Sequence, residues 1–273
     1  MNTICQRNMK IIRYEDPTGA FRYGSEQSDG KVFELNGDLF GSLQPTDKTA
    51  EIKRRLAPIA PTSLIGIGLN YRRHAEESGA KIPERPIVFI KLLNSLQNPE
   101  DPIEIPRSSQ EVDYECELAV VIGKDCRNAS PEESLEYVLG YTCANDVSAR
   151  DWQLKWGGGQ WCRGKSFDTF CPLGPVLVTA DEIPDPNDLK IQTILNNDIV
   201  QDWNTSDMIF DVPNLISFLS QDTTLVPGTV ILTGTPHGVG MAAKPPRYLR
   251  PGDIVSISLE KIGALTNPVV AAG

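Results

Sequence analysis

Four acidic residues recur at every second position in EVDYECELAVVIG, residues 111–123: Glu111, Asp113, Glu115 and Glu117. The residues between them favour β-structure, and the alternation predicts a strand with one buried face. Side chains two apart on a strand point the same way, so the four carboxylates would share one face. Like charges repel there, and burying them unpaired is expensive. The pattern therefore predicts either a solvated acidic face or a buried positive partner.

A metal ion is the simplest buried partner for Glu115 and Glu117. Their Cα atoms would lie about 7 Å apart, close enough for both carboxylates to reach one ion. Oxygen ligands favour Mg²⁺, Mn²⁺ or Ca²⁺. A third acid, Asp146, follows an apolar stretch in YTCANDVSARDWQ, residues 141–153. Capping a helical turn is the alternative role of Asp146.

Four further side chains have the chemistry to hold an anionic substrate near these acids. Lys165, in RGKSFD, would complement the carboxylates and hold a developing enolate or carboxylate, although a surface lysine is the alternative. Arg150 offers a fork for a substrate carboxylate, and Gln153 three residues later could share that task. Thr235 and the amides of TGTP, residues 233–236, could bind a second carboxylate or simply form a tight turn.

The segment HAEE places His74 and Glu77 three residues apart, so the two side chains meet on one helix face. A carboxylate beside an imidazole orients the ring and raises its basicity, which suits a general base. A solvated ion pair is the alternative. The glycine- and proline-containing stretch that follows predicts the edge of a mobile lid. His237 receives no role and is interpreted as a loop residue.

These residues must be positioned by a sheet-rich fold. Residues 9–60 alternate short strand patterns with turns and predict a small β-rich N-terminal domain spanning 1–60, with the first eight residues an extension and at most one short helix within 49–58. From residue 61 to 273, seven strand patterns outnumber three helical ones and do not alternate with them regularly. This organisation favours a mixed α+β fold over a βαβ barrel or a doubly wound sheet. The strand patterns are 63–68, 86–91, 117–123, 173–179, 189–196, 228–234 and 253–260, and the helical ones are 71–79, 130–140 and 212–221.

Composition limits the classes of partner. The chain has 273 residues, a formal net charge of −10 and a pI of about 4.8, which argues against nucleic acid and anionic membranes as partners. No apolar run approaches a membrane span, and the N-terminal residues contain no apolar signal core. The six cysteines show no metal-binding or disulfide spacing and are interpreted as reduced, which predicts a cytoplasmic protein.

Five longer motifs together resemble the fumarylacetoacetate hydrolase superfamily, over nearly the whole chain from residue 63. They are GLNYRRHAEE (68–77), EVDYECELAVVIGK (111–124), NDVSARDWQ (145–153), GGQWCRGKSFDTFCPLGP (158–175) and ILTGTPHGVG (231–240). Within the superfamily, two segments resemble the branch called fumarylacetoacetate hydrolase domain-containing protein 2. They are GKSFDTFCPLGP (164–175) and AKPPRYLRPGD (243–253).

The resemblance implies a fold and a metal site. The expected fold is a large mixed β-sheet roll with a small N-terminal domain, usually as a homodimer, in the cytoplasm or in the mitochondrial matrix of a eukaryote. It implies that Glu115, Glu117 and Asp146 bind Mg²⁺ or Mn²⁺. Glu111 and Asp113 are not implied as ligands and are expected near the site mouth or in solvent.

The resemblance also implies a reaction. The His74–Glu77 pair would act as the catalytic dyad beside Lys165, on an enolate formed from a small 2-oxo acid. Three reactions share that enolate: tautomerisation of oxaloacetate, decarboxylation of oxaloacetate, and hydrolysis of a C–C bond in an acylpyruvate or fumarylpyruvate. Tautomerisation is the prediction, and the other two remain alternatives. A non-enzymatic relative would lack part of this residue set, which is complete here.

Overall fold

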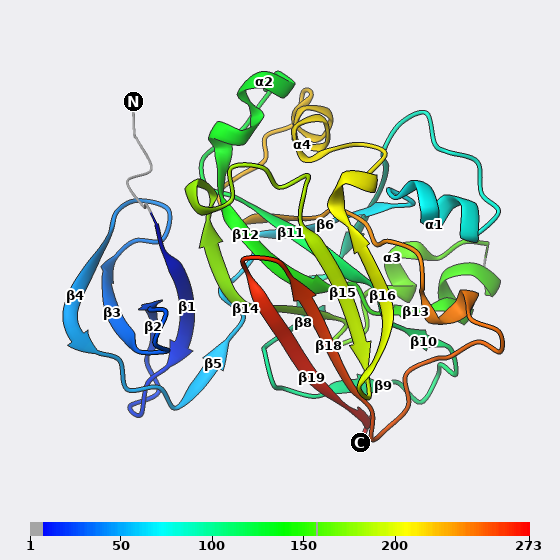
Figure 1. Cartoon of the computed structure of the whole chain (residues 1–273), viewed down its shortest axis with the longest axis horizontal. Helices are drawn as coiled ribbons and strands as arrows, with labels where there is room; N and C mark the ends of the chain where they lie inside the picture. The colour runs from blue at the N-terminus through cyan, green and yellow to red at the C-terminus, as the bar shows by residue number, and fades with distance from the viewer. Residues whose placement is uncertain (1–7, 157) are drawn as a thin grey trace.

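The computed structural model describes residues 8–156 and 158–273. The predicted N-terminal extension, except Asn8, lies outside the described residues. A twelve-stranded sheet and a five-stranded sheet dominate the molecule, with short helices at their ends and margins (Figure 1). The fold is therefore mixed α+β, as the sequence predicts.

Strands make up most of the regular structure between residues 8 and 273. The strands are β1 (Lys10–Glu15), β2 (Phe21–Glu26), β3 (Val32–Gly37), β4 (Leu43–Thr49), β5 (Arg54–Leu56), β6 (Ser63–Gly68), β7 (Ile87–Lys91), β8 (Leu96–Gln97), β9 (Ile103–Ile105), β10 (Val112–Asp113), β11 (Cys116–Ile122), β12 (Val138–Asn145), β13 (Ser148–Ala149), β14 (Cys171–Thr179), β15 (Lys190–Leu195), β16 (Asp198–Asn204), β17 (Thr229–Leu232), β18 (Ile254–Leu259) and β19 (Gly263–Ala271). The α-helices are α1 (Arg72–Glu77), α2 (Pro131–Ser134), α3 (Trp161–Gly164) and α4 (Val212–Ser220). Shorter helical turns are η1 (Leu93–Ser95), η2 (Leu135–Tyr137), η3 (Asp151–Lys155), η4 (Ala180–Glu182), η5 (Thr205–Asp207) and η6 (Gly240–Ala242).

The large sheet runs in the order β4-β3-β2-β1-β14-β12-β11-β17-β6-β7. Most neighbouring strands are antiparallel, whereas β17 and β6 pair in parallel, so the sheet is mixed. The smaller sheet, β16-β15-β18-β19-β9, lies against the central strands β11, β12 and β14. This second layer covers one face of the strands that carry the acidic residues.

The N-terminal strands β1 to β4 form the predicted meander, which stands to one side of the molecule in Figure 1. No helix forms within 49–58, where the sequence allowed at most one short helix. Arg54–Leu56 forms β5 instead, because this segment pairs with β1 and Arg55 forms an ion pair with Glu26. Strand β1 also pairs with β14, so the meander continues the large sheet, and the boundary at residue 60 stays a prediction.

Strand β11 is buried on both faces, not on one as its alternation predicts. Leu118, Val120 and Ile122 belong to the core beneath the small sheet, while Ala119 and Val121 belong to a second core on the other side. A strand buried on both faces tolerates a continuous apolar run, which explains CELAVVI. The acids at its beginning therefore start inside the protein.

Two of the three predicted helices form as expected. Helix α1 lies within 71–79, and α4 follows its N-cap Asp211, whose side chain accepts a hydrogen bond from the Asn214 amide. The third prediction, 130–140, is partly wrong. Only α2 and η2 are helical, and from Val138 the chain enters β12, where pairing with β11 and β14 buries every residue.

The two ends of the large sheet differ in character. Its β4 end carries exposed polar residues and Pro45. At the other end, β7 turns the exposed side chains Val88 and Ile90 outward, and the exposed Leu92 and Leu93 follow directly. An exposed apolar edge strand is unusual unless something covers it.

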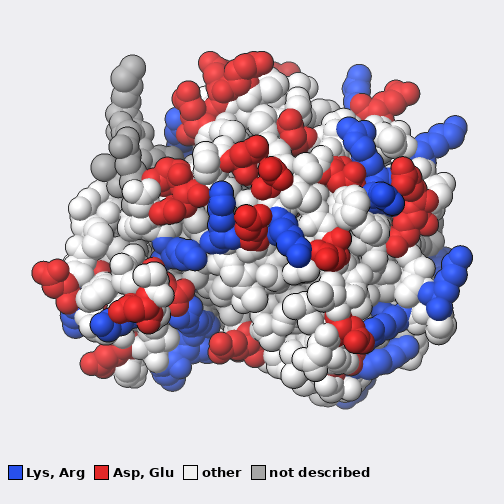
Figure 2. Space-filling view, in the orientation of Figure 1, with Lys and Arg blue, Asp and Glu red and all other residues white. Residues whose placement is uncertain are grey.

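No helix among residues 8–156 and 158–273 has the length and apolarity to span a bilayer. The face in Figure 2 carries acidic and basic side chains close together rather than one continuous basic area. The five described cysteines are free thiols, four of them buried and Cys162 exposed.

Candidate active site

Glu115, Glu117 and Asp146 come together, as the sequence predicts. Glu115 directly precedes β11, Glu117 lies on it, and Asp146 directly follows β12. Because β11 and β12 are antiparallel, the start of one lies beside the end of the other, and the Asp146 amide donates to the Glu115 carbonyl at 3.0 Å. One oxygen from each carboxylate lies within 4.8 Å of the others, and all three side chains are buried.

Two buried ammonium groups hold this cluster. Lys165 Nζ donates to Glu115 Oε2 at 2.7 Å, to Asp146 Oδ2 at 2.6 Å and to Ser148 Oγ at 2.6 Å. Lys91 Nζ donates to the other oxygen of Asp146 at 2.6 Å. The sequence prediction included Lys165 but missed Lys91. The available signal was a lysine that ends the apolar strand pattern PIVFIK.

Glu117 lacks such a counter-charge. Within the described chain no ion pair with a basic side chain reaches it, and its hydrogen-bond donor is the Gly234 amide, at 2.7 Å. Burial, reinforced by the charges of Asp146 and Glu115, raises the pKa of Glu117 well above its ordinary value. A divalent cation would supply the missing charge, and three buried carboxylates are a donor set that suits a hard cation. The residues therefore fit a metal site of the predicted kind.

The Gly234 contact changes one expectation. Gly234 belongs to the TGTP turn, whose amides were predicted to bind a substrate carboxylate, yet its amide already binds Glu117. Thr235 does line the cavity next to the cluster, and its hydroxyl oxygen accepts a hydrogen bond from Gln201 at 2.9 Å. The turn thus supports the acidic cluster as well as facing the cavity.

Arg150 lies at the centre of a second buried network. Its guanidinium donates to Asp113 Oδ2 at 2.9 Å, to Glu115 Oε1 at 2.7 Å and to Gln153 Oε1 at 2.9 Å. The expectation that Asp113 lies near the mouth or in solvent is wrong: it is fully buried, because Arg150 and the Gly240 amide (2.7 Å) both bind it. Burial raises the pKa of Asp113 despite the neighbouring guanidinium.

The strand expected across the four acids is interrupted: β-structure stops after Asp113 and resumes after Glu115. Strand β10 ends at Asp113 and β11 starts at Cys116, so the four acids do not share one strand face. Glu111 is the outermost and pairs with Lys155 near the surface. The acids nevertheless converge, because Arg150 bridges Asp113 to Glu115.

His74 and Glu77 also meet as predicted, on helix α1. His74 Nδ1 lies 3.4 Å from Glu77 Oε2, and the Gly238 amide donates to both Glu77 oxygens at 2.9 and 3.1 Å. Burial acts to raise the pKa of Glu77, but the hydrogen bonds from His74 and Gly238 outweigh it and leave that pKa lowered. Glu77 therefore stays a carboxylate that can orient the imidazole.

Helix α1 is fixed over the cavity by contacts outside the dyad. The Arg73 amide donates to Asp207 at 3.0 Å, and the Arg73 guanidinium lies 5.0 Å from the centre of the Trp203 ring. Both partners belong to the segment that forms β16 and η5. His237, which had no predicted role, packs edge-on against Trp203 with ring centres 4.8 Å apart.

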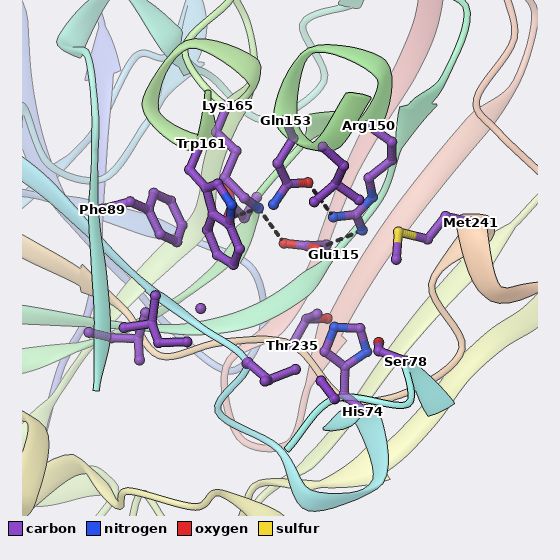
Figure 3. Close-up of a pocket in the computed structure, with 17 residues that line it drawn as sticks. His74, Ser78, Phe89, Glu115, Arg150, Gln153, Trp161, Lys165, Thr235 and Met241 are labelled. Carbon is purple, nitrogen blue, oxygen red and sulfur yellow. Dashed lines mark hydrogen bonds and ion pairs between the residues drawn. The ribbon is translucent and has the colours of Figure 1, made fainter. Parts of the chain in front are cut away.

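A cavity of about 290 Å³ joins these groups. In Figure 3 the carboxylate of Glu115 lies between Lys165 and Arg150, with Gln153 above it and His74 and Thr235 below. Seven of the nine predicted site residues line this cavity, and Glu77 and Glu117 do not. The seven are His74, Glu115, Asp146, Arg150, Gln153, Lys165 and Thr235. The arrangement can bind a small anion against buried cationic groups and present an imidazole to it.

Comparison with known proteins agrees with this arrangement. Residues 63–270 match the family model described as fumarylacetoacetate (FAA) hydrolase C-terminal, and residues 9–54 match a model described as Rv2993c-like, N-terminal. A mitochondrial oxaloacetate tautomerase of Xenopus laevis is 52% identical over 216 residues, 79% of this chain and 68% of that protein. A mitochondrial oxaloacetate tautomerase of Homo sapiens is 48% identical over 216 residues, 79% of this chain and 69% of that protein.

A solved structure extends the likeness to the complete fold. The fumarylacetoacetate hydrolase of Exiguobacterium antarcticum superimposes with a TM-score of 0.86 at 38% identity, over 97% of this chain and 100% of that one. The family match covers all the strands and turns that carry the site residues described above. The chain belongs to the fumarylacetoacetate hydrolase family.

Proposed function

We propose that this protein is a divalent-cation-dependent enzyme that catalyses the keto–enol tautomerisation of oxaloacetate, a small 2-oxo dicarboxylate. The observation that carries the proposal is the meeting of a buried three-carboxylate cluster and the His74–Glu77 dyad around one cavity. The names of the Xenopus and human relatives support the choice of substrate.

The proposed metal ligands are Glu115, Glu117 and Asp146, with Mg²⁺ or Mn²⁺ as the ion. When bound, such an ion supplies electrophilic polarisation of the 2-oxo group. Lys165 and Arg150 add fixed positive charge beside the same position, where negative charge develops in an enolate. Both cationic groups are held by carboxylates, so their positive charge is fixed in place before the substrate binds.

His74 is the proposed proton carrier. It lines the cavity, and the contact with Glu77 would hold its ring in one orientation. In the forward direction the enol loses its O–H proton and gains a C–H bond at C3, so one imidazole can serve both transfers. Gln153 and Thr235 line the same cavity and are proposed to orient the substrate carboxylates.

Decarboxylation of oxaloacetate and C–C hydrolysis of an acylpyruvate remain the alternatives. The hydrolase name of the Exiguobacterium relative favours C–C hydrolysis. Hydrolysis needs a water molecule delivered to a distal carbonyl and donors for the oxyanion that forms there. Tautomerisation needs only the His74–Glu77 dyad and the proposed cation site, both of which adjoin the cavity.

Three assays on one Mg²⁺-loaded preparation test the proposal. Decay of enol-oxaloacetate is followed by ultraviolet absorbance, pyruvate release from oxaloacetate by coupled reduction, and cleavage of acetylpyruvate or fumarylpyruvate by loss of the enol band. Fast tautomerisation that disappears in His74→Ala, with negligible cleavage, is expected. Efficient cleavage with tautomerisation no faster than buffer would identify a hydrolase instead.

The protein is also proposed to act as a homodimer that covers the apolar face of β7. An edge strand pairs readily with a second copy of itself, and such a contact is self-complementary. Light scattering on the wild type and on Ile90→Lys tests this, with Ile254→Lys as the control at another exposed isoleucine. A dimer that survives Ile90→Lys would exclude this face.

The proposed location is the cytoplasm, or the mitochondrial matrix in a eukaryote, which the mitochondrial relatives support.

A further inference from the structure

One end of the active-site cavity is apolar. Phe89 from β7 and Trp161 from α3 lie with ring centres 5.9 Å apart and both line the cavity. Figure 3 shows the two rings on the side of Lys165 that faces away from Arg150 and His74. Lys165 Nζ is 5.0 Å from the centre of the Phe89 ring, so the apolar end begins directly beside the ammonium group.

Strand β6 makes room for these rings by carrying glycine opposite each of them. A Cβ atom on Gly66 would lie 2.1 Å from the Phe89 ring, and one on Gly68 would lie 2.3 Å from the Trp161 ring. Gly66 is also the cross-strand partner of Phe89. The rings therefore rest on bare backbone, and a side chain at either glycine would force the ring beside it to move.

Helix α3 couples the apolar end to the charged end. Trp161 and Lys165 are one helical turn apart, and the Lys165 amide donates to the Trp161 carbonyl at 3.1 Å. Gly164 between them lies against the backbone of Gln153, where a Cβ would come within 2.8 Å of the Gln153 nitrogen. An anion held at Lys165 thus has its remaining atoms next to an aromatic wall.

The size of the whole cavity and the chemistry of its apolar end do not suit a dicarboxylate alone. The cavity of about 290 Å³ approaches the 300–1,000 Å³ typical of sites for drug-sized ligands, which is more space than a four-carbon acid requires. A second carboxylate against the two rings would lose its hydration without gaining a hydrogen bond. An apolar substituent there would instead bury its surface against them.

We propose that Phe89 and Trp161 form a subsite for an apolar group on C3 of the substrate, and that the protein also tautomerises 2-oxo acids bearing an aromatic or branched aliphatic group, with enol-phenylpyruvate as the test compound. This inference rests on the proposed tautomerase function. The step is the same: the O–H bond at C2 breaks, a C–H bond forms at C3, and His74 carries the proton. No oxidant, reductant or leaving group takes part.

The kinetic test compares the two enols on the same protein. The expected kcat/KM for enol-phenylpyruvate lies within about tenfold of that for enol-oxaloacetate, and Trp161→Ala lowers it about tenfold while changing the oxaloacetate value less than threefold. Gly68→Ala, which moves the ring without removing it, is expected to act in the same direction. Trp156→Ala is the control, since this exposed tryptophan does not line the cavity.

A binding measurement gives an independent readout. By calorimetry, the unreactive analogue phenyllactate is expected to bind Trp161→Ala about tenfold more weakly than wild type, and malate less than threefold more weakly. Turnover of oxaloacetate without turnover or binding of the phenyl compounds would overturn the subsite and leave the proposed function standing. Equal losses of affinity for phenyllactate and malate in Trp161→Ala would also overturn the subsite. Absence of any tautomerase activity would overturn the proposed function itself.

Discussion

Lys91 and Asp146 form an ion pair of 2.6 Å in which neither side chain reaches solvent. The pair joins the end of β7 to the residue that follows β12, across 55 positions of sequence. Lys165 binds the other oxygen of Asp146, so this carboxylate has a separate ammonium group on each side. Asp146 is thereby fixed in orientation toward Glu115 and Glu117 before any ion binds.

Replacing Lys91 with Met should destabilise the metal-free protein by about 3–5 kcal/mol, because it leaves a buried carboxylate with one counter-charge fewer. Urea unfolding in the presence of a chelator measures the change. The loss should be smaller in excess Mg²⁺, since a cation in the cluster would compensate part of the missing charge. Lys81→Met, at an exposed lysine, is the control. Equal losses with and without Mg²⁺ would argue against a cation at this position.

Substituting Glu117 with Gln should abolish Mg²⁺ binding while leaving the metal-free protein at least as stable as wild type. The glutamine side chain is nearly isosteric with that of Glu117 and can still accept from the Gly234 amide, but the substitution removes one of three crowded carboxylates. Calorimetry on chelator-stripped protein and thermal unfolding test the two parts. Glu111→Gln, at the outermost acid, is the matched control. Unchanged Mg²⁺ affinity in Glu117→Gln would remove Glu117 from the ligand set.

Removing the imidazole of His74 should lower kcat by about 10²–10⁴, the range for loss of a general base. Binding of oxalate, an enolate mimic, should change much less, because Arg150 and Lys165 are untouched. Steady-state kinetics and calorimetry on His74→Ala separate the two effects. Oxalate affinity that collapses while turnover persists would make His74 a binding residue.

The lowered pKa of Glu77 predicts a specific pH dependence of the protein's stability. Its pKa is lowered in the folded protein from an ordinary value of 4.5, so its ionised form stabilises the fold above that pH, and the contribution fades as pH falls through the folded pKa. Glu77→Gln should therefore be less stable than wild type at neutral pH, and the difference should narrow as the pH falls below 4.5 and through the lowered folded pKa of Glu77. Urea midpoints at several pH values test this, with the exposed neighbour Glu76→Gln expected to match wild type throughout. A difference that does not narrow would mean that Glu77 acts through its shape alone.

The acidic cluster was predictable because its signal is local. Alternating acids followed by an apolar run place Glu115 and Glu117 at the entrance to a buried strand, and Asp146 ends another apolar run. The dyad was predictable for the same reason, since three residues of separation on a helix fix the meeting of His74 and Glu77.

The rest depended on contacts between distant segments. Asp113 is buried only because Arg150 and the amide of Gly240, 127 positions away, converge on it. Lys91 has a surface lysine as its default interpretation, and only the pairing of β7 with β6 brings it over Asp146. The strand at 54–56 follows the same pattern, because its pairing with the distant β1, rather than the local preference of a short segment, decides its structure.

The unlike ends of the large sheet limit how copies of the chain can assemble. At the β4 end, Pro45 lacks a backbone donor and the charged Asp47 and Lys48 face solvent, so a further strand gains little there. At the β7 end, by contrast, Val88 and Ile90 are apolar and exposed. In the proposed homodimer, pairing through the β7 end would leave the β4 end of each copy without a partner, so this sheet would form a closed pair rather than a head-to-tail chain.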